Sequence, residues 1–515
     1  MATYLTPGVY VEENLAPANR GNGTAALACG AFVGLAGKGP TVPTRVRTWA
    51  QYVNLFGSFA DSSGSYLPHA VHQFFANGGA QCYIVRATRS DAVAATANLK
   101  DSTTPTAMNG LKITALAEGA WGNTTSITIK PTGAPGGRFE LQVLDSGVIK
   151  ERFGDLSSNP DDSRYAISIV NSPYAGSLLI KVSNLKSSTA GYTYDPVKDI
   201  IPAQSVTLAG GDDGEEPYDY VEAAKQLENV PSTNFDLNLP AISDPNILNP
   251  ILTWAQAEGN IFVIIDGPKA AEGATNAQVM QGYTSLVEGP TALNASSYGA
   301  VYGPWLMCQD PSSAMYGAAR LLPPGGLVMG QASRIDVVRH PAKAPAGTET
   351  ALTGVLYAEA RFTEPQLDVL AEAHVNVIRM VPGHGHCIMG TRTLKRTLPD
   401  LYVPVRRMVI FLRKAMSDQL QWAVMEPNGP DLWDKIRLVL THYLSMVRKA
   451  GMLEGLSDAE AFFVRCDGDN NPRSEINAGR LNVDVGVALR YPAEFIIIHL
   501  GNYENGPIVT DEILF

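Results

Sequence analysis

The chain has 515 residues, of which 45% are hydrophobic and 17% are charged, and its formal net charge is −11. This hydrophobic content excludes disorder as the main state, and the length predicts roughly three domains. The negative charge argues against a general nucleic-acid-binding protein, which needs a basic surface. Because ordinary soluble proteins carry about 25% charged residues, this chain either buries much of its own surface or buries it against copies of itself.

No targeting or membrane segment is expected. Residues 1–7 have neither the basic start nor the apolar run of a signal peptide. No apolar run approaches the roughly 18 residues of a membrane span. The cysteines are odd in number and scattered, which is typical of reduced thiols in a chain that folds in the cytosol. They are Cys29, Cys82, Cys308, Cys387 and Cys466.

The N-terminal part predicts an extended arm followed by an α/β unit. Residues 1–18 form the expected arm, with a strand from Tyr4 to Val11 that contains Val9 and Tyr10. Residues 19–90 alternate between strand and helix patterns, which favours an α/β unit. The expected elements are a strand around Ala31–Val33, helices over Trp49–Phe56 and Tyr66–Asn77, and a strand over Cys82–Arg86.

The middle of the chain predicts two different modules. Residues 91–205 are rich in small and polar residues and show period-2 runs at 126–130, 139–144 and 178–182, which indicate a β-rich module. Residues 206–355 return to α/β character. Ile261–Asp266 there is a continuous apolar run, typical of a buried parallel strand.

The last third, residues 356–500, is again predicted as α/β. Helices are expected over Glu364–Ala373, Val405–Trp422 and Pro430–Ala450, and strands over Val375–Met380 and Phe462–Arg465. Two more strands, Leu481–Leu489 and Phe495–Leu500, are expected to form a hairpin around Tyr491-Pro492.

The C-terminal segment, residues 501–515, carries apolar residues where a chain end is normally polar. They are Ile508, Val509, Ile513, Leu514 and Phe515. Such a segment either folds back on its own domain or adds a strand to a neighbouring subunit. The strand from Tyr4 to Val11 poses the same question at the other end. Two strand-like arms favour a polymer that is linked subunit to subunit.

The sequence contains no complete signature of an enzyme active site or of a metal site. The chain contains no G-x-S-x-G, H-E-x-x-H or G-x-x-x-x-G-K-[ST] motif. The Gly37–Pro40 run lacks the upstream glycine of a phosphate loop, and Gly383–Cys387 lacks a second ligand pair for zinc. The loop from Asp467 has proline and alanine where a calcium loop requires glycine and glutamate. Asp266 is expected to cap a turn, so no catalytic residue, cofactor or metal ligand is predicted.

One basic helix stands out in the acidic chain. It carries Arg406, Arg407, Arg413 and Lys414. These residues form either a solvated helix face or a surface that docks on an acidic protein.

Several motifs, in order along the chain, resemble contractile tail sheath proteins. At the N-terminus, the segment Thr6–Glu13 resembles the opening of these proteins. Other matching motifs are Phe32–Gly34, Phe74–Gly79, Cys82–Arg86, Ala120–Asn123, Gly390–Leu394, Val405–Arg407, Trp422–Asn428, Phe462–Asp467, Gly479–Leu481 and Pro492–Phe495. The overall pattern is similar to sheaths of phage tail-like contractile injection systems, with a contractile phage tail as the alternative. A subtilisin-like hydrolase is a less favoured alternative, because no catalytic triad is found.

The resemblance implies a structural subunit rather than an enzyme. A core domain would combine residues 19–90 with 356–500, interrupted by the β-rich domain 91–205 and by a subtilisin-like α/β domain, 206–355. The arms, 1–18 and 501–515, would pair with a hairpin of neighbouring subunits that contains Val483, Val485, Val487, Phe495 and Ile497.

The resemblance also implies a set of partners. Hexameric rings would stack helically around an inner tube protein and bind baseplate and cap or terminator proteins, with no direct contact to nucleic acid and no membrane insertion. The basic helix would be the candidate tube contact. Assembly would take place in the bacterial cytoplasm, and contraction of the extended sheath would drive the tube through a target envelope.

Overall fold

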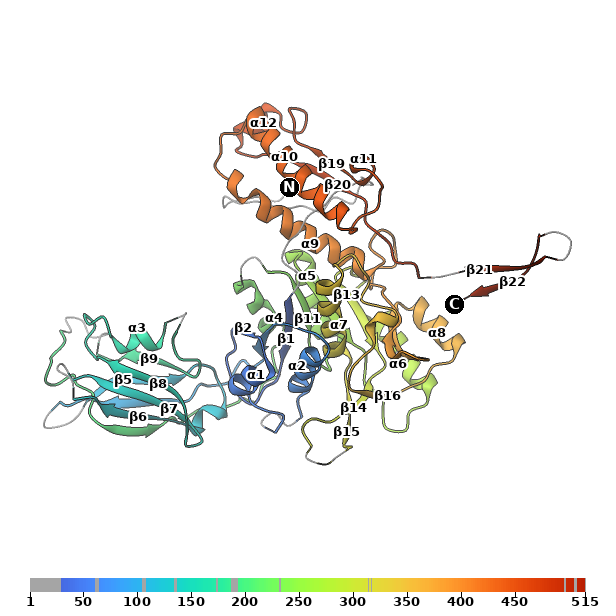
Figure 1. Ribbon diagram of the computed structural model, residues 1–515. Helices are drawn as coiled ribbons and strands as arrows, with labels where there is room; N and C mark the ends of the chain where they lie inside the picture. Colours follow the sequence, from blue (N-terminus) through green and yellow to red (C-terminus); the bar gives the residue numbers. More distant parts are fainter. Residues whose placement is uncertain are drawn as a thin grey trace.

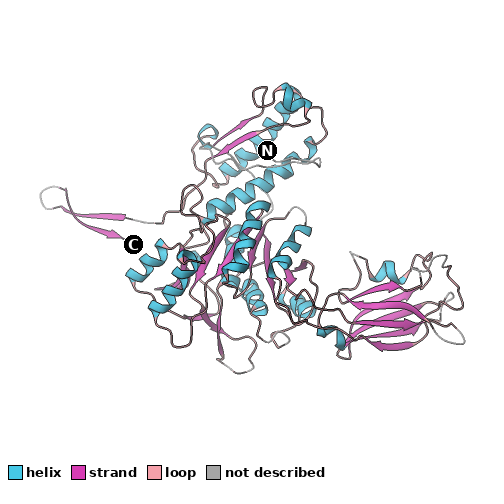
Figure 2. Cartoon of the chain, turned by 180° about the vertical axis from the view of Figure 1, so that it is seen from behind, coloured by secondary structure: helices cyan, strands magenta, loops and turns pink. Residues whose placement is uncertain are grey.

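The computed structural model describes residues 29–60, 64–103, 108–133, 137–172, 175–186, 193–230, 233–313, 315, 317–494, 497–503 and 507–514. Over these residues the fold is mixed α/β with several sheets, as the sequence predicts. Figure 1 shows a central α/β body, a β-rich lobe to one side and a smaller C-terminal unit above the body. A two-stranded C-terminal hairpin extends away from the body, and the same arrangement is seen from behind in Figure 2.

The body is built on one eight-stranded sheet in the order β18-β17-β13-β12-β11-β1-β3-β2. The strands from β17 to β3 are parallel, and β18 and β2 are antiparallel edge strands. The bounds are β1 Cys29–Gly34, β2 Thr44–Val46, β3 Cys82–Arg86, β11 Phe235–Asn238, β12 Ile261–Asp266, β13 Gly299–Gly303, β17 Val375–Val381 and β18 Gly385–Ile388. A smaller antiparallel sheet, β15-β14-β16, lies beside it, with β14 Leu306–Gln309, β15 Ala319–Leu322 and β16 Val355–Ala358.

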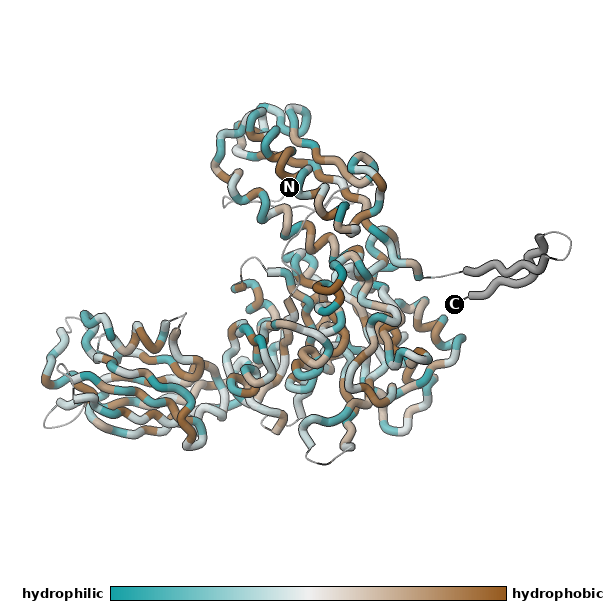
Figure 3. The backbone as a smooth tube through the Cα atoms, viewed as in Figure 1, coloured by the Kyte–Doolittle hydropathy of each residue, from teal (hydrophilic) through white to brown (hydrophobic). Residues whose placement is uncertain are grey.

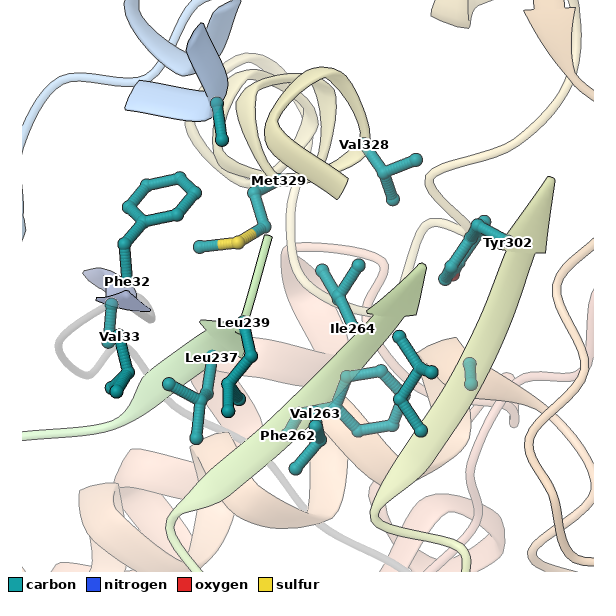
Figure 4. Packing of buried hydrophobic residues seen from close by; sticks show 14 of the residues in the cluster. Phe32, Val33, Leu237, Leu239, Phe262, Val263, Ile264, Tyr302, Val328 and Met329 are labelled. Atoms are coloured by element: carbon teal, nitrogen blue, oxygen red, sulfur yellow. The ribbon is translucent and has the colours of Figure 1, made fainter. Parts of the chain in front are cut away.

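Helices cover both faces of the body sheet. Gly30 of β1 faces α2 and α7, because a Cβ there would come within 3.0 Å of Phe74 and 3.2 Å of Met329. The α5 helix lies on the opposite face, where Leu252 packs against Gly299 of β13. Figure 4 shows Val328 and Met329 of α7 over the apolar strand residues. Burial on both faces explains why every residue of β12 is buried and why its sequence is almost entirely apolar.

The helices predicted over Trp49–Phe56, Tyr66–Asn77 and Glu364–Ala373 are present in the body as α1, α2 and α8, together with helices that were not predicted. Their bounds are α1 Trp49–Phe56, α2 Leu67–Ala76, α4 Tyr220–Lys225, η2 Gln226–Asn229, α5 Pro245–Glu258, α6 Asn276–Glu288, α7 Gly325–Val338, η3 Thr348–Thr350 and α8 Glu364–Glu372. Thr275 and Thr363 form capping boxes at the starts of α6 and α8, which fixes where these helices begin.

The body sheet crosses the domain boundaries expected from the sequence. Strand β1 pairs directly with β11, and β13 pairs with β17. Segments 29–86, 235–303 and 375–388 therefore form one sheet, and the predicted separation of 19–90 from 206–355 is wrong. The sequence could not reveal this pairing, because hydrophobic periodicity identifies a strand but not its partner.

The β-lobe has its own hydrophobic core and two antiparallel sheets, β10-β6-β7-β8 and β4-β5-β9. Its elements are β4 Thr96–Lys100, β5 Asn109–Ala115, η1 Ala120–Thr124, β6 Thr125–Pro131, β7 Phe139–Asp145, β8 Val148–Leu156, α3 Ala166–Val170, β9 Ile180–Asn184 and β10 Gln204–Thr207. Lys38 of the body donates to Asp145 of the lobe at 2.5 Å. The Gly37–Pro40 turn, rejected above as a phosphate loop, thus helps to hold the lobe on the body.

The C-terminal unit consists of long helices and a two-stranded sheet. Its elements are α9 Val403–Leu420, η4 Gln421–Ala423, α10 Pro430–Lys449, α11 Asp458–Ala461, β19 Phe462–Arg465, α12 Arg473–Asn477 and β20 Asp484–Val487. The apolar face of α10, formed by Leu432, Ile436, Leu440 and Leu444, is buried against this sheet. Figure 3 shows hydrophobic segments in this unit as well as in the body and the lobe, in agreement with their separate buried clusters.

The predicted hairpin of Leu481–Leu489 with Phe495–Leu500 is wrong. Strand β20 pairs with β19, whereas β21 (Ile497–Tyr503) pairs with β22 (Pro507–Leu514). The long helix α10 offers β19 and β20 a common apolar surface, which local sequence does not show. In the described residues, no helix combines the length and the apolar character that a membrane crossing needs.

Candidate assembly site

The β19–β20 sheet is a small receiving surface on the C-terminal unit. Phe462 and Val464 of β19 and Val485 of β20 pack on α10, while Phe463 on the other face is 41% exposed. Among the described strands, β19 and β20 pair only with each other, so each leaves one edge without a strand partner. Open edges present backbone N–H and C=O groups to an added strand.

Glu494 anchors the chain just before the C-terminal hairpin. Its carboxylate accepts from Arg392 Nε at 2.8 Å and from the Tyr402 hydroxyl at 3.0 Å. Tyr491 packs edge-on against Tyr402, with 6.1 Å between the ring centroids. Burial and the adjacent Glu494 raise the pKa of Tyr402, so its hydroxyl stays protonated as a donor. The anchor fixes the point from which the hairpin leaves the body.

The C-terminal hairpin holds most of the predicted C-terminal arm residues. Its antiparallel register runs from Ile497 opposite Leu514 to Tyr503 opposite Pro507, with a bulge at Leu500/Gly501. Ile508, Val509, Ile513 and Leu514 all lie in β22. The other arm residues, Tyr4, Val9, Tyr10, Val11 and Phe515, lie outside the described residues, as does Phe495.

The prediction that Arg406 and Arg407 face a partner surface is wrong. The two residues are only 2% and 5% exposed. Arg406 donates to Asp400 at 2.5 Å and lies over the ring of Tyr298. The alternative of a solvated face fails for the same reason. The local sequence of the helix does not show whether its arginines are packed against the rest of the fold.

Arg407 bridges two other elements of the body. It donates to Asp236 of β11 at 2.7 and 3.2 Å, and to Asp336 of α7 at 2.6 and 3.0 Å. Burial raises the pKa of Asp336 to about 6, although the arginine opposes the rise. The two carboxylates raise the pKa of Arg407, so the guanidinium remains charged. Arg407 therefore joins the C-terminal unit to the body sheet.

Arg413 and Lys414 remain at intermediate exposure further along α9. Lys414 pairs with Asp418 one turn later. A tube-facing role for these two residues stays a prediction.

Asp266 is a structural carboxylate, as predicted. It accepts from the backbone N–H of Gly325 at 2.6 Å and of Ala241 at 3.0 Å, and from the Asn238 amide at 3.2 Å. Burial raises its pKa to about 6. The residue thereby holds the start of α7 against the carboxyl end of the sheet, with its acceptor atoms already used.

The metal-like motifs are also explained by local structure. Arg465 pairs with Asp467 at 3.2 Å and with Asp469 at 2.8 Å, so a cationic side chain occupies the carboxylates that resembled a calcium loop. The His384–Cys387 run forms the turn and first residues of the β17–β18 hairpin. No three potential metal-ligating side chains come together in the described ranges.

The structure brings together residues that the sequence did not connect. Arg392, Tyr402 and Glu494 each lie in or next to a quoted motif, but their contact spans about 90 to 100 residues. Their separate motifs were a weak signal, and only the tertiary fold shows that they form one anchor. Val485 and Val487 lie in β20 and Ile497 lies in β21, so the predicted receiving set is divided between two sheets.

Comparisons with known proteins agree with this architecture. No protein-family model matches the sequence. The tail sheath protein of Vibrio phage KVP40 is 25% identical over 182 residues, which cover 35% of this chain and 26% of that protein. The match therefore spans about a quarter of the length of that relative.

Solved structures match over most of the chain. The sheath of the PVC extracellular contractile injection system, in its contracted state, is 20% identical with a TM-score of 0.56, covering 98% of this chain and 99% of that one. The contracted helical sheath of the anti-feeding prophage is 21% identical with a TM-score of 0.55, covering 97% and 99%. A sheath tail protein from Listeria innocua is 11% identical with a TM-score of 0.57, covering 87% and 90%.

The fold is that of the contractile tail sheath proteins. The sequence match to a phage tail sheath protein points to the same class of protein. The resemblance drawn from the sequence motifs is confirmed.

Proposed function

We propose that the chain is the sheath subunit of a contractile injection system. It polymerises as helically stacked hexameric rings around an inner tube and contracts to drive the tube through a target envelope. The supporting observation is the fold shared with two contracted injection-system sheaths along at least 97% of this chain. The role is structural, and Asp266, the residue best placed for catalysis, already holds the fold together.

Subunits are linked by strand addition at the β19–β20 sheet. Its open edges would accept the arms of neighbouring subunits, 1–18 and 501–515. The β19–β20 sheet takes the place of the wrongly predicted receiving hairpin. Val485 and Val487 of β20 remain part of the surface that receives the arm of a neighbouring subunit. Each added backbone hydrogen bond contributes about 1 kcal/mol, so several per strand keep the subunits connected while they rotate.

The exposed stripe of α10 is a better tube contact than the buried arginines of α9. Leu438 is 71% exposed and Met446 is 42% exposed on a helix whose other face is fully packed. Lys435, His442 and Lys449 are exposed at helical spacing beside them. This apolar and basic stripe suits an acidic tube surface, with Arg413 and Lys414 as additional candidates.

The free energy for contraction comes from the difference between two packings of the same subunits. The body sheet, the Arg407 bridge and the Glu494 anchor give each subunit a fixed framework. Even about 1 kcal/mol per subunit becomes large when coupled interfaces switch together. Baseplate and cap or terminator proteins would set the start and the end of the sheath, which assembles in the bacterial cytoplasm.

Electron microscopy tests the proposal directly. Coexpression with the tube protein should give helical sheaths, and deletion of Ile508–Phe515 should leave folded subunits that no longer form long sheaths. A matched control is Val197→Asp in the β-lobe, because Val197 is 72% exposed and lies outside both proposed linking surfaces. A chain that remains monomeric with the tube protein would overturn the proposal.

A second candidate is the tail sheath of a contractile phage. The match to the KVP40 tail sheath protein favours it. Both candidates predict the same polymer. Purified particles decide between them, because a phage tail is joined to a DNA-filled capsid and an injection system is not.

A further inference from the structure

The C-terminal hairpin pairs the chain with itself. Strands β21 and β22 share one continuous antiparallel register, interrupted only by the bulge at Leu500/Gly501. Neither strand joins a sheet with any other described strand. Figures 1 and 2 show both strands extending away from the body.

An isolated hairpin of this kind has little to hold it closed. Because β21 and β22 form a sheet of two strands among the described residues, the hairpin is at best marginally stable in water. The closed form satisfies the backbone groups of one edge in each strand but is readily opened.

The closed hairpin is also short for a connection between subunits. Seven residues of β21 extend about 23 Å, and the register returns Leu514 to the level of Ile497. Opened, the 20 residues from 495 to 514 reach about 65 Å. A compact chain of 515 residues has a radius of gyration of about 24 Å, so the centres of neighbours lie roughly 50 Å apart. Only the open form spans that distance with length to spare.

We propose that the C-terminal hairpin is the self-inhibited form of the C-terminal arm. In the free subunit β21 pairs with one edge of β22, so that this edge is not available to other copies of the chain. During assembly the hairpin opens, and β22 pairs with the β19–β20 sheet of a second copy. The Glu494 anchor holds the root in place, so opening changes the arm without releasing it from the body. This regulation rests on the proposed function, because it controls the arm that links the subunits.

A disulfide across the hairpin provides the test. Ile498 and Ile513 are register partners, and Cα atoms of antiparallel partners lie about 4.5–5.5 Å apart, which suits a disulfide. The full-length variant I498C/I513C is made with Cys29→Ser, because the other four native thiols are buried. The adjacent pair, H499C/E512C, is a second lock in the alternate hydrogen-bonding position. Sheath that sediments with the tube protein is measured in oxidised and reduced samples.

The oxidised lock should reduce sheath formation at least about tenfold, and reductant should restore it. A control lock between Lys130 and Glu140 joins β6 to β7 in the β-lobe, which stay paired throughout, and should leave assembly unchanged when oxidised. Sheaths of normal yield from the fully oxidised hairpin locks would overturn the inference while leaving the sheath function intact. Failure of the wild-type chain to assemble would overturn both.

Discussion

Replacing Arg407 by methionine should weaken the contact between the C-terminal unit and the body sheet and lower the stability of the folded chain. The substitution keeps most of the side-chain volume but removes four hydrogen bonds to Asp236 and Asp336. Both carboxylates are buried, so each loses its cation without gaining water. Removing one partner of a buried ion pair costs about 3–5 kcal/mol. For a unit of this size that corresponds to a fall in melting temperature of roughly 6–20 °C.

The effect should depend on pH with a defined sign. The pKa of Asp336 is raised to about 6 in the folded chain, above its ordinary value of 3.8. Stability from this shift is present in full below about 3.8 and is lost as the pH rises through about 6. Without Arg407 the two carboxylates repel each other and the folded pKa rises further. The variant should therefore lose less stability at pH 5 than at pH 7.5.

Thermal unfolding of the full-length chain at pH 7.5 and pH 5 measures both effects. Arg413→Met is the matched control on the same helix, because Arg413 is only partly buried, and it should cost less than about 1 kcal/mol. Adding Asp236→Asn and Asp336→Asn to Arg407→Met should recover much of the loss, because no unpaired charge then remains buried. An Arg407→Met variant that melts within about 2 °C of the wild type at pH 7.5 would refute this account of the bridge.

Three further predictions concern the other contacts described above. Phe463 lies on the exposed face of β19, so Phe463→Asp should change the stability in thermal unfolding by less than about 1 kcal/mol. The same substitution should reduce the amount of sheath that sediments. A sheath yield equal to that of the wild type would exclude that face from assembly. Glu494→Gln should weaken the hydrogen bonds that Arg392 and Tyr402 donate to this side chain. The melting temperature of the body should stay nearly unchanged, whereas the sheath yield should fall. Glu454→Gln is the control at a surface carboxylate and should leave both unchanged. Asp266→Ala should destabilise the chain by about 2–4 kcal/mol in denaturant unfolding, because two backbone N–H groups lose their acceptor. Unchanged stability would contradict its role in holding the start of α7.

The sequence predicted the individual elements well where one local pattern dominates. The apolar run Ile261–Asp266 is the buried strand β12, and the helix predicted over Pro430–Ala450 is α10. The motifs also predicted the sheath family, which the comparisons confirm. The exclusion of a calcium loop and of a catalytic Asp266 rested on spacing alone, and the structure supplies the partners that explain both residues.

Contacts between distant segments were decided only by the tertiary structure. The pairing of β1 with β11 joins residues about 200 positions apart. Strand β20 pairs with β19 and not with β21, the strand that follows it in the chain. Arg407 has the same local sequence whether it is solvated or buried, and carboxylates supplied by β11 and α7 pair with it in the fold.

The low charge and the apolar arms were visible from the sequence, and they indicated a chain that reserves surface for copies of itself. Hydrophobic periodicity is local, so it specified which segments become strands and helices. Strand partners and the burial of charge depend on groups far apart in the chain, and the folded structure alone brings those groups within bonding distance.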